Sequence, residues 1–185
     1  PGTGTEKRLA VITAAKKRDA ERISELFSAN GMLLANLQSE SIATANLYAN
    51  ELRGNNANKT LAILDIGAEN TNFCVIGQDK IWFRSFSFGG TTFNRAIGKS
   101  LLTTNEIAEE RKINTKSAGK EIGKAILALR IPFEDLLAEV RRSLQAYQAD
   151  ICPKTPNEIW CIGGGSYTSG LLTYLRHGAE SLSIN

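Results

Sequence analysis

The chain has 185 residues, of which 42% are hydrophobic and 22% are charged, a composition typical of a folded globular protein. Its 22 Lys and Arg residues outnumber the 19 Asp and Glu residues only slightly and are spread along the chain, which argues against a nucleic-acid-binding protein. No apolar run approaches the roughly eighteen residues of a membrane span, and three widely spaced cysteines predict free thiols rather than disulfides.

The first part of the chain predicts a small α/β unit. Short apolar runs predict strands at Lys7–Ala14 and Leu33–Leu37. Apolar residues at helical spacing predict helices over Arg18–Asn30, closed by Gly31, and over Ser41–Leu52. Turn-forming residues at 54–59 (GNNANK) then mark a boundary, so we expect one unit at residues 1–54 and a second at 58–185.

The second unit predicts a sheet with several helices. Three strands come first, at Leu61–Ile66, Asn72–Ile76 and Lys80–Phe88, and a fourth follows much later, at Glu158–Ile162. Between and after them the pattern predicts five helices: one capped by Thr91, then Asn105–Lys112, Lys116–Leu129, Pro132–Asp150 with its proline in the first turn, and a closing helix near Ser169–Ala179.

The stretch DIGAENTN, residues 65–72, interrupts two apolar strands with an acid and a glycine. A buried carboxylate is costly unless it is paired or faces a cation, so Asp65 needs an explanation. One interpretation is a phosphate motif: Asp65 faces a hydrated magnesium ion, Gly67 lets backbone amides approach a phosphate, and Thr71 adds a hydroxyl. The alternative is a plain strand–turn–strand in which Asp65 binds turn amides.

Two further segments carry candidate ligand residues. Gly163, Gly164 and Gly165 lie between an apolar strand and a helix, which either lets a flat base or ribose approach or simply makes a tight connection. Glu109 and Lys112 are three residues apart on one helix face, where they either hold ribose hydroxyls or pair with each other.

The order of these motifs, DIGAENTN, then FGG, AEERK and GGG, is similar to the second half of the actin-like ATPases. Within that superfamily, TNFCVIGQDKIWFRSFSFGGTTFNRAI and the later VRRSLQAYQAD resemble the PilM family of type IV pilus assembly proteins. Residues 7–50 resemble the small inserted subdomain of PilM and of its division relative FtsA, with a helix returning to the first lobe. The resemblance implies an α/β, ribonuclease H-like actin fold, present as that subdomain and most of the second lobe.

The resemblance also implies roles for individual residues. Asp65 is assigned to magnesium-bound water, and Gly67 and Thr71 are assigned to the phosphates of ATP. Glu109 and Lys112 are assigned to the ribose, and Gly163, Gly164 and Gly165 to the adenosine. No residue is assigned as catalytic, because the chain offers no identifiable general base, and hydrolysis is expected to be slow at most. The first phosphate loop would precede Pro1, so we expect a piece of a longer protein.

The implied function is that of a cytoplasmic scaffold at the inner face of the bacterial inner membrane. Its expected partner is the cytoplasmic tail of an inner-membrane pilus protein of the PilN type, added as a strand beside Leu9–Thr13 or Leu33–Leu37. Three alternatives remain: an FtsA-like division protein, a small-molecule kinase of the same superfamily, and a scaffold that no longer binds nucleotide. Within DIGAENTN, Glu69 departs from the phosphate motif of the actin-like ATPases, because it adds a negative charge near the proposed phosphates.

Overall fold

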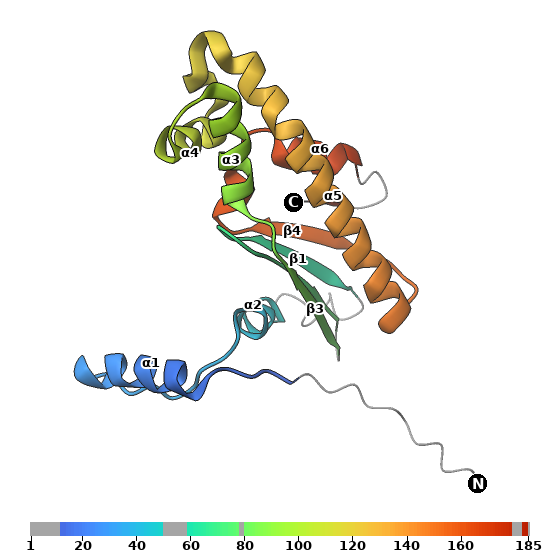
Figure 1. Ribbon diagram of the computed structural model, residues 1–185. Helices are drawn as coiled ribbons and strands as arrows, with labels where there is room; N and C mark the ends of the chain where they lie inside the picture. The colour runs from blue at the N-terminus through green and yellow to red at the C-terminus, as the bar shows by residue number, and fades with distance from the viewer. Residues whose placement is uncertain (1–11, 50–58, 78–79, 179–182, 185) are drawn as a thin grey trace. The chain divides into compact units, whose positions relative to one another are not determined.

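The structure is a computed structural model that describes residues 12–49, 59–77, 80–178 and 183–184. Its contacts divide the chain into two units, Pro1–Ala43 and Thr44–Asn185, and the division falls inside helix α2 (Glu40–Ala49). The boundary that the sequence predicts at residues 54–58 lies outside the described residues. Figure 1 shows the second unit as a sheet with helices packed along it.

The described part of the first unit contains helix α1, Lys17–Ala29, where the apolar spacing predicts it. Asn30 ends the helix by donating from Nδ2 to the carbonyl of Leu26 (2.8 Å), and Gly31 follows with a φ of +69°. The predicted strand at Leu33–Leu37 is wrong, and residues 12–14 form no strand either; residues 7–11 lie outside the described part. A strand needs a ladder partner, and the described residues of this unit supply none.

The second unit is built on a mixed five-stranded sheet in the order β3-β2-β1-β4-β5. Strand β1 (Leu61–Ile66) pairs antiparallel with β2 (Thr71–Ile76), which pairs antiparallel with β3 (Ile81–Phe86). On its other side β1 pairs parallel with β4 (Glu158–Ile162), which pairs parallel with β5 (Ser183–Ile184). Short turns make the antiparallel half, whereas the parallel half needs a crossover, which the helices between β3 and β4 provide.

Side chains alternate between the two faces of this sheet, and each face has its own core. Ala62, Leu64 and Ile66 of β1 join Phe73 and Val75 of β2 in a large cluster with the helices that follow. Leu61 and Ile63 of β1 face the opposite way and pack with Cys74, Ile76 and Ala45. On that side the Tyr48 and Trp160 rings meet edge to face at 5.5 Å. The central strands are therefore buried on both sides, which explains their nearly continuous apolar sequence.

The helices of the second unit follow the predicted order with different boundaries. They are α3 (Gly90–Leu101), α4 (Asn105–Ile113), the 3-10 helix η3 (Thr115–Glu121), α5 (Ile122–Asp150), the 3-10 helix η4 (Gly164–Tyr167) and α6 (Leu171–Gly178). Thr91 does not cap α3, because the helix begins at Gly90 and Thr91 lies inside its first turn. The Thr91 hydroxyl instead donates to the carbonyl of Ala68 (2.8 Å).

The two helices predicted at 116–129 and 132–150 are wrong, because α5 runs without a break from Ile122 to Asp150 through Pro132. A proline inside a helix removes one hydrogen bond and costs about 3 kcal/mol or more. The buried row Leu129, Phe133, Leu136 and Val140 continues across the proline at helical spacing. This row is buried in the core that α5 shares with the sheet and with α3 and α6, where the Phe133 ring meets Phe93 and Tyr174, and that burial outweighs the cost.

Arg84 of β3 fastens the sheet to α5. Its guanidinium donates to the carboxylate of Glu139 (2.8 Å) and to the Ser143 hydroxyl (2.9 Å), and Arg142 also pairs with Glu139. Burial raises the pKa of the Glu139 carboxyl, but hydrogen bonds and charges from the two arginines outweigh burial and leave that pKa below its ordinary value. The carboxylate therefore stabilises the folded state above about pH 4.5, and this contribution is lost as the pH falls through the lowered pKa.

Glu139→Gln is accordingly expected to lower the free energy of unfolding by about 1–2 kcal/mol at pH 7, since it removes a partly buried, charge-assisted pair. The difference from wild type should shrink as the pH falls below about 4.5. Urea unfolding of both proteins between pH 3 and pH 7 measures this. A difference that stays constant across the range would contradict the role given to the carboxylate.

Candidate functional site

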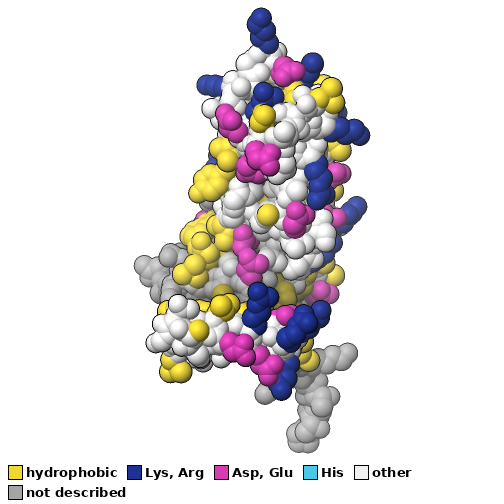
Figure 2. Space-filling model, turned by 60° about the vertical axis from the view of Figure 1, so that its left-hand side comes forward, with side chains coloured by type: hydrophobic (Ala, Val, Ile, Leu, Met, Phe, Trp, Pro, Cys, Tyr) yellow, Lys and Arg dark blue, Asp and Glu magenta, His cyan; other side chains and the backbone are white. Residues whose placement is uncertain are grey.

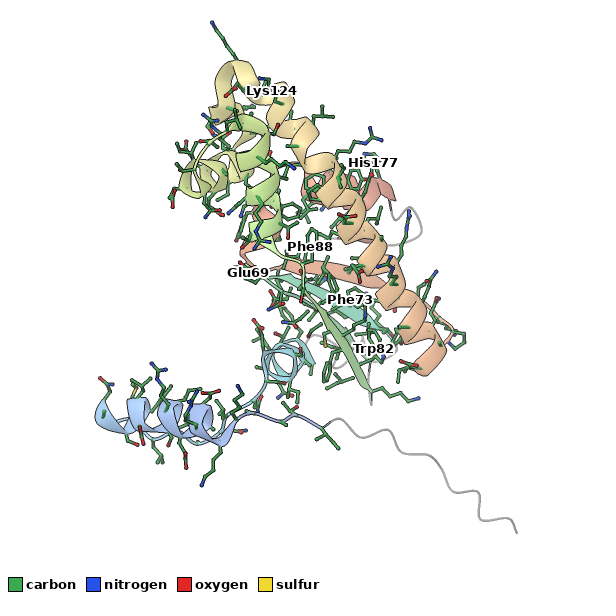
Figure 3. All side chains as sticks on the ribbon, viewed as in Figure 1. Glu69, Phe73, Trp82, Phe88, Lys124 and His177 are labelled. Atoms are coloured by element: carbon green, nitrogen blue, oxygen red, sulfur yellow. The ribbon has the colours of Figure 1, made fainter. Side chains whose placement is uncertain are left out.

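Segments far apart in sequence meet at one end of the sheet. The turn between β1 and β2 accepts two hydrogen bonds from the start of α3: Gly90 N donates to Gly67 O (2.8 Å) and Thr91 N to Ala68 O (2.9 Å). Figure 3 shows Glu69 of this turn and Phe88 at that end of the sheet, whereas Trp82 lies toward the other end. The DIGAENTN and FGG motifs therefore form one continuous backbone surface.

The glycines after β4 lie against the end of β1. A Cβ atom at Gly163 would lie 2.4 Å from Oδ1 of Asp65, and one at Gly165 would lie 2.3 Å from Cγ2 of Ile66. Gly163 also has a φ of +81°. Close packing thus requires two of the three glycines with or without a ligand. Gly164 is different, because it is exposed and a Cβ atom there would meet nothing within 4 Å.

Glu109 and Lys112 of α4 reach the same place. Lys112 is only 3% exposed, and its Nζ lies 2.7 Å from Oε2 of Glu109 and 3.1 Å from where a Cβ atom of Gly90 would be. Burial raises the pKa of Glu109, but hydrogen bonds from Lys112 and Asn94 and the charge of Lys112 outweigh it, so this pKa is lowered. The pair is therefore charged and largely buried on its lysine side, not an ordinary exposed helix pair.

Thr71 and Asp65 face opposite sides of the sheet. Thr71 pairs directly with Ile66, is fully buried on the side of α3 and α5, and donates its hydroxyl to the carbonyl of Phe88 (2.6 Å). Asp65 pairs with Asn72 and Ile162 and is half-buried on the other side. The hydroxyl of Thr71 thus holds the chain just before Gly89 and Gly90, and its role toward phosphate stays a prediction.

The acid that departs from the motif, Glu69, is neutralised locally. Its side chain is exposed and forms an ion pair with Arg95 of α3 at 3.4 Å. The arginine supplies a positive charge beside the carboxylate, which reduces the repulsion that the sequence predicts for an approaching phosphate.

Asn94 is a buried member of this cluster that the sequence analysis did not identify. Its Nδ2 donates to Oε2 of Glu109 (2.6 Å), so α3 and α4 are joined through the same carboxylate oxygen that binds Lys112. A signal was present in the sequence. Asn94 occupies a place in the buried row Gly90, Asn94, Ile97 and Leu101 of α3, where a polar side chain is costly unless it has a partner.

Two cavities of the second unit lie away from this cluster. One, of about 580 Å³, lies between α5 and α6 and is lined by residues such as Leu127, Phe133, Tyr174 and His177. The other, of about 270 Å³, surrounds the Arg84–Glu139 pair. None of the predicted ligand residues lines either cavity.

Three general features of the described residues concern metal ligands, membrane-spanning helices and the distribution of surface charge. Within the described ranges, no three His, Cys, Asp or Glu side chains are grouped closely enough to hold a metal ion by themselves. None of the described helices is long and apolar enough to cross a bilayer. On the face in Figure 2, basic and acidic side chains are interspersed.

Comparison with known proteins gives a family and a fold. The family model of the type IV pilus assembly protein PilM matches residues 3–184, whereas no curated protein matches. A solved PilM-PilN type IV pilus biogenesis complex has 25% identity and a TM-score of 0.72, covering 92% of this chain and 51% of that one. Ethanolamine utilization protein EutJ from Carboxydothermus hydrogenoformans has 21% identity and a TM-score of 0.65, covering 90% and 56%. MreB5 of Spiroplasma citri, bound to AMPPNP, has 18% identity and a TM-score of 0.64, covering 94% and 60%.

These comparisons confirm the actin-like fold that the order of motifs implies. The chain spans only about half to three fifths of the length of the solved structures that it resembles. The family match extends over both units and almost every residue, from position 3 to position 184. The chain therefore belongs to the family of the type IV pilus assembly protein PilM.

Proposed function

We propose that this chain is part of a nucleotide-binding scaffold of type IV pilus assembly that binds the cytoplasmic tail of an inner-membrane protein of the PilN type. The observation that carries the proposal is the family match over residues 3–184. A PilM-PilN complex among the similar structures supports the choice of partner. The match favours this function over an FtsA-like division protein or a small-molecule kinase. The scaffold would act in the cytoplasm and reach the inner membrane through its partner.

The nucleotide proposed for the longer protein is ATP with magnesium. Asp65 would face magnesium-bound water, and the turn at Gly67 would offer backbone amides to the phosphates. Magnesium in proteins keeps several waters and takes one or two carboxylates together with phosphate oxygens, so a single acid from this half is enough. Glu109 and Lys112 would contact the ribose, and Gly163, Gly164 and Gly165 the adenosine. The convergence of these segments at one end of the sheet supports the assignment.

The residues present can do two things for such a nucleotide: they bind it and they fix its orientation. ATP would supply negative charge and hydrogen-bonding groups to the residues of this lobe that hold it. A ligand shifts a conformational equilibrium only by its differential affinity for the two states. The nucleotide is therefore proposed as a ligand that sets the shape of the scaffold.

The first unit is the proposed docking place for the partner tail. It exposes several large apolar side chains to solvent, which are Ile12, Leu26, Phe27, Met32, Leu33 and Leu37. Exposed apolar groups gathered in one small unit are typical of an interaction surface. Residues 33–37 have no ladder partner among the described residues, and a tail that binds as a strand would supply one.

Leu33→Asp in the full-length protein is expected to weaken binding of a synthetic PilN-type tail peptide by at least tenfold. Burying one leucine contributes about 1.5–3 kcal/mol, and a carboxylate in its place adds a desolvation cost. Fluorescence polarisation of the labelled peptide measures the affinity. Leu102→Asp is the matched control, because Leu102 and Leu33 are both 93% exposed and Leu102 belongs to the other unit.

The same experiment with Ile12→Asp extends the test to the residues before α1. We expect this variant also to lose the peptide while the second unit stays folded. Equal affinity of wild type, Leu33→Asp and Ile12→Asp would contradict docking on the first unit. Loss of affinity only in Leu102→Asp would move the docking place to the second unit.

A further inference from the structure

Strand β3 leaves one edge of the sheet open. It is the outermost strand in the order β3-β2-β1-β4-β5, and the described residues pair with it only on the β2 side (Figure 1). Proteins usually protect such an edge with a proline, a bulge or an exposed charge. β3 has an uninterrupted register with β2 and no proline, and its one charged side chain, Arg84, is bound to Glu139 of α5. The edge is therefore available for pairing with another strand.

The backbone groups that face outward from this edge follow from the hairpin. Gly77 N donates to Lys80 O (2.9 Å), so these two residues form a hydrogen-bonded pair. Such pairs alternate along an antiparallel ladder, which directs toward β2 the backbone of alternate residues, namely Trp82, Arg84 and Phe86. The residues between them therefore point their N–H and C=O groups outward, and these are Ile81, Phe83 and Ser85.

Opposite charges lie at the two ends of the edge. Lys80 is exposed just before β3 begins. Asp135 of α5 is exposed at the other end, where it lines the hollow of about 270 Å³ beside Phe86. Neither charge has an ion pair or hydrogen bond within the described ranges. Six residues of extended chain, roughly 20 Å, separate Lys80 from Phe86, so the two charges do not meet within one chain.

A strand with this pattern is complementary to a second copy of itself. We propose that two copies of this chain pair antiparallel through β3, about a two-fold axis at Phe83. In this register Phe83 lies opposite Phe83 of the second copy, and Ile81 lies opposite Ser85. These are the residues whose backbone groups point outward, so every outward-facing N–H and C=O group of both strands gains a partner.

The same register matches the charges. It places Lys80 opposite Phe86 of the second copy, at the hollow that Asp135 of that copy lines. It also places Trp82 opposite Arg84, a favourable pairing of a cation with an aromatic ring. The two-fold axis repeats both contacts at the other end of the edge. This complementarity between the two ends is the reason for choosing a second copy over a strand of another protein.

The consequence is a closed dimer. An isologous pair uses the open edge of both copies, so that association stops at two chains and leaves no edge at β3 for a third. The inference goes beyond the proposed scaffold function and depends on neither the nucleotide nor the partner tail, and its failure would leave both of those proposals standing.

Sedimentation equilibrium of the full-length protein measures the dimer. We expect wild type to dimerise with a dissociation constant of about 1–100 μM, at the weak end of protein interfaces. Lys80→Glu and Asp135→Lys should each weaken dimerisation about tenfold, because symmetry places the new like-charge pair at both ends of the edge. The double variant restores opposite charges and should return to within about threefold of wild type. Lys116→Glu is the matched control, since Lys116 is an exposed lysine of η3 outside the edge.

Ser85→Pro tests the backbone pairing separately. It removes an outward N–H that the ladder to β2 does not use, so β3 should stay in the sheet while dimerisation is lost. Circular dichroism checks the fold, and the charge-exchange variants decide the question if this variant does not fold.

Three results would overturn the inference. The first is a wild-type protein that stays monomeric to about 200 μM, above the expected range of dissociation constants. The second is a double variant that remains as weak as the single variants. The third is a folded Ser85→Pro protein that dimerises like wild type, which would mean that the copies associate through another surface.

Discussion

Gly164→Val in the full-length protein is expected to weaken Mg-ATP binding about ten- to hundredfold while leaving the free energy of unfolding nearly unchanged. The reason is the contrast among the three glycines after β4. Gly163 and Gly165 are required by packing against Asp65 and Ile66, whereas Gly164 faces open space on the exposed surface. If an adenosine lies against this segment, the added side chain at 164 occupies the place of the ligand and disturbs nothing else.

Calorimetric titration and urea unfolding of the same variant measure the two halves of this prediction. Gly123→Val is the matched control, because Gly123 of α5 is also exposed with nothing within 4 Å of its missing Cβ. Gly163→Ala is the opposite control and should unfold the second unit, since its Cβ would overlap Asp65 and its φ is positive. Unchanged ATP affinity in a folded Gly164→Val variant would leave the glycines as a tight connection and remove adenosine from this surface.

Glu109→Leu is expected to destabilise the second unit by about 2–4 kcal/mol, whereas Lys112→Met should cost about 1 kcal/mol or less. The asymmetry follows from burial. Removing the carboxylate leaves the Lys112 ammonium, at 3% exposure, without a counter-charge, and it also removes the acceptor of the Asn94 amide. Removing the ammonium leaves a carboxylate that is 46% exposed and reaches water, and methionine fills much of the space of the lysine stem.

Urea unfolding of the two single variants and of the Glu109→Leu/Lys112→Met double variant at pH 7 measures the asymmetry. The double variant is expected to be more stable than Glu109→Leu, because it no longer buries an unpaired charge. Equal costs for the two single variants, or a double variant that is the least stable of the three, would mean that Lys112 reaches water in the folded state and that the pair acts as an ordinary surface ion pair.

Local patterns in the sequence were sufficient to predict most of the second unit. Apolar runs predicted β1, β2 and β4 to within one residue. In β1 and β2 the run is nearly continuous, because these strands are buried on both faces. Helical spacing predicted α1, α3 and α4. In α3 and α4 the apolar positions include buried residues, whereas α1 buries none of its side chains. The order of four short motifs was sufficient to predict the family, since each motif is common alone and their succession is not.

Predictions failed where a residue depends on a partner that is remote in sequence. Leu33–Leu37 has the composition of a strand but no ladder partner among the described residues, and pairing is a property of two segments rather than one. Pro132 is typical of a helix start, yet the apolar row on both sides of it is buried in one core, and that shared burial keeps α5 continuous. The intrinsic conformational preference of a short segment contributes less free energy than such tertiary packing, which routinely overrides it.

The candidate site divides in the same way. The sequence by itself determined which residue types the site contains, because acids, glycines and a lysine at those spacings suit phosphate and ribose. Only the tertiary structure decided their surroundings: it turned Thr71 away from Asp65, buried Lys112 and joined Asn94 to Glu109. The physical reason is that each of these features depends on two segments. The register between β1 and β2 determines which face of the sheet a side chain lies on. The packing of α3 against α4 determines which side chains are buried.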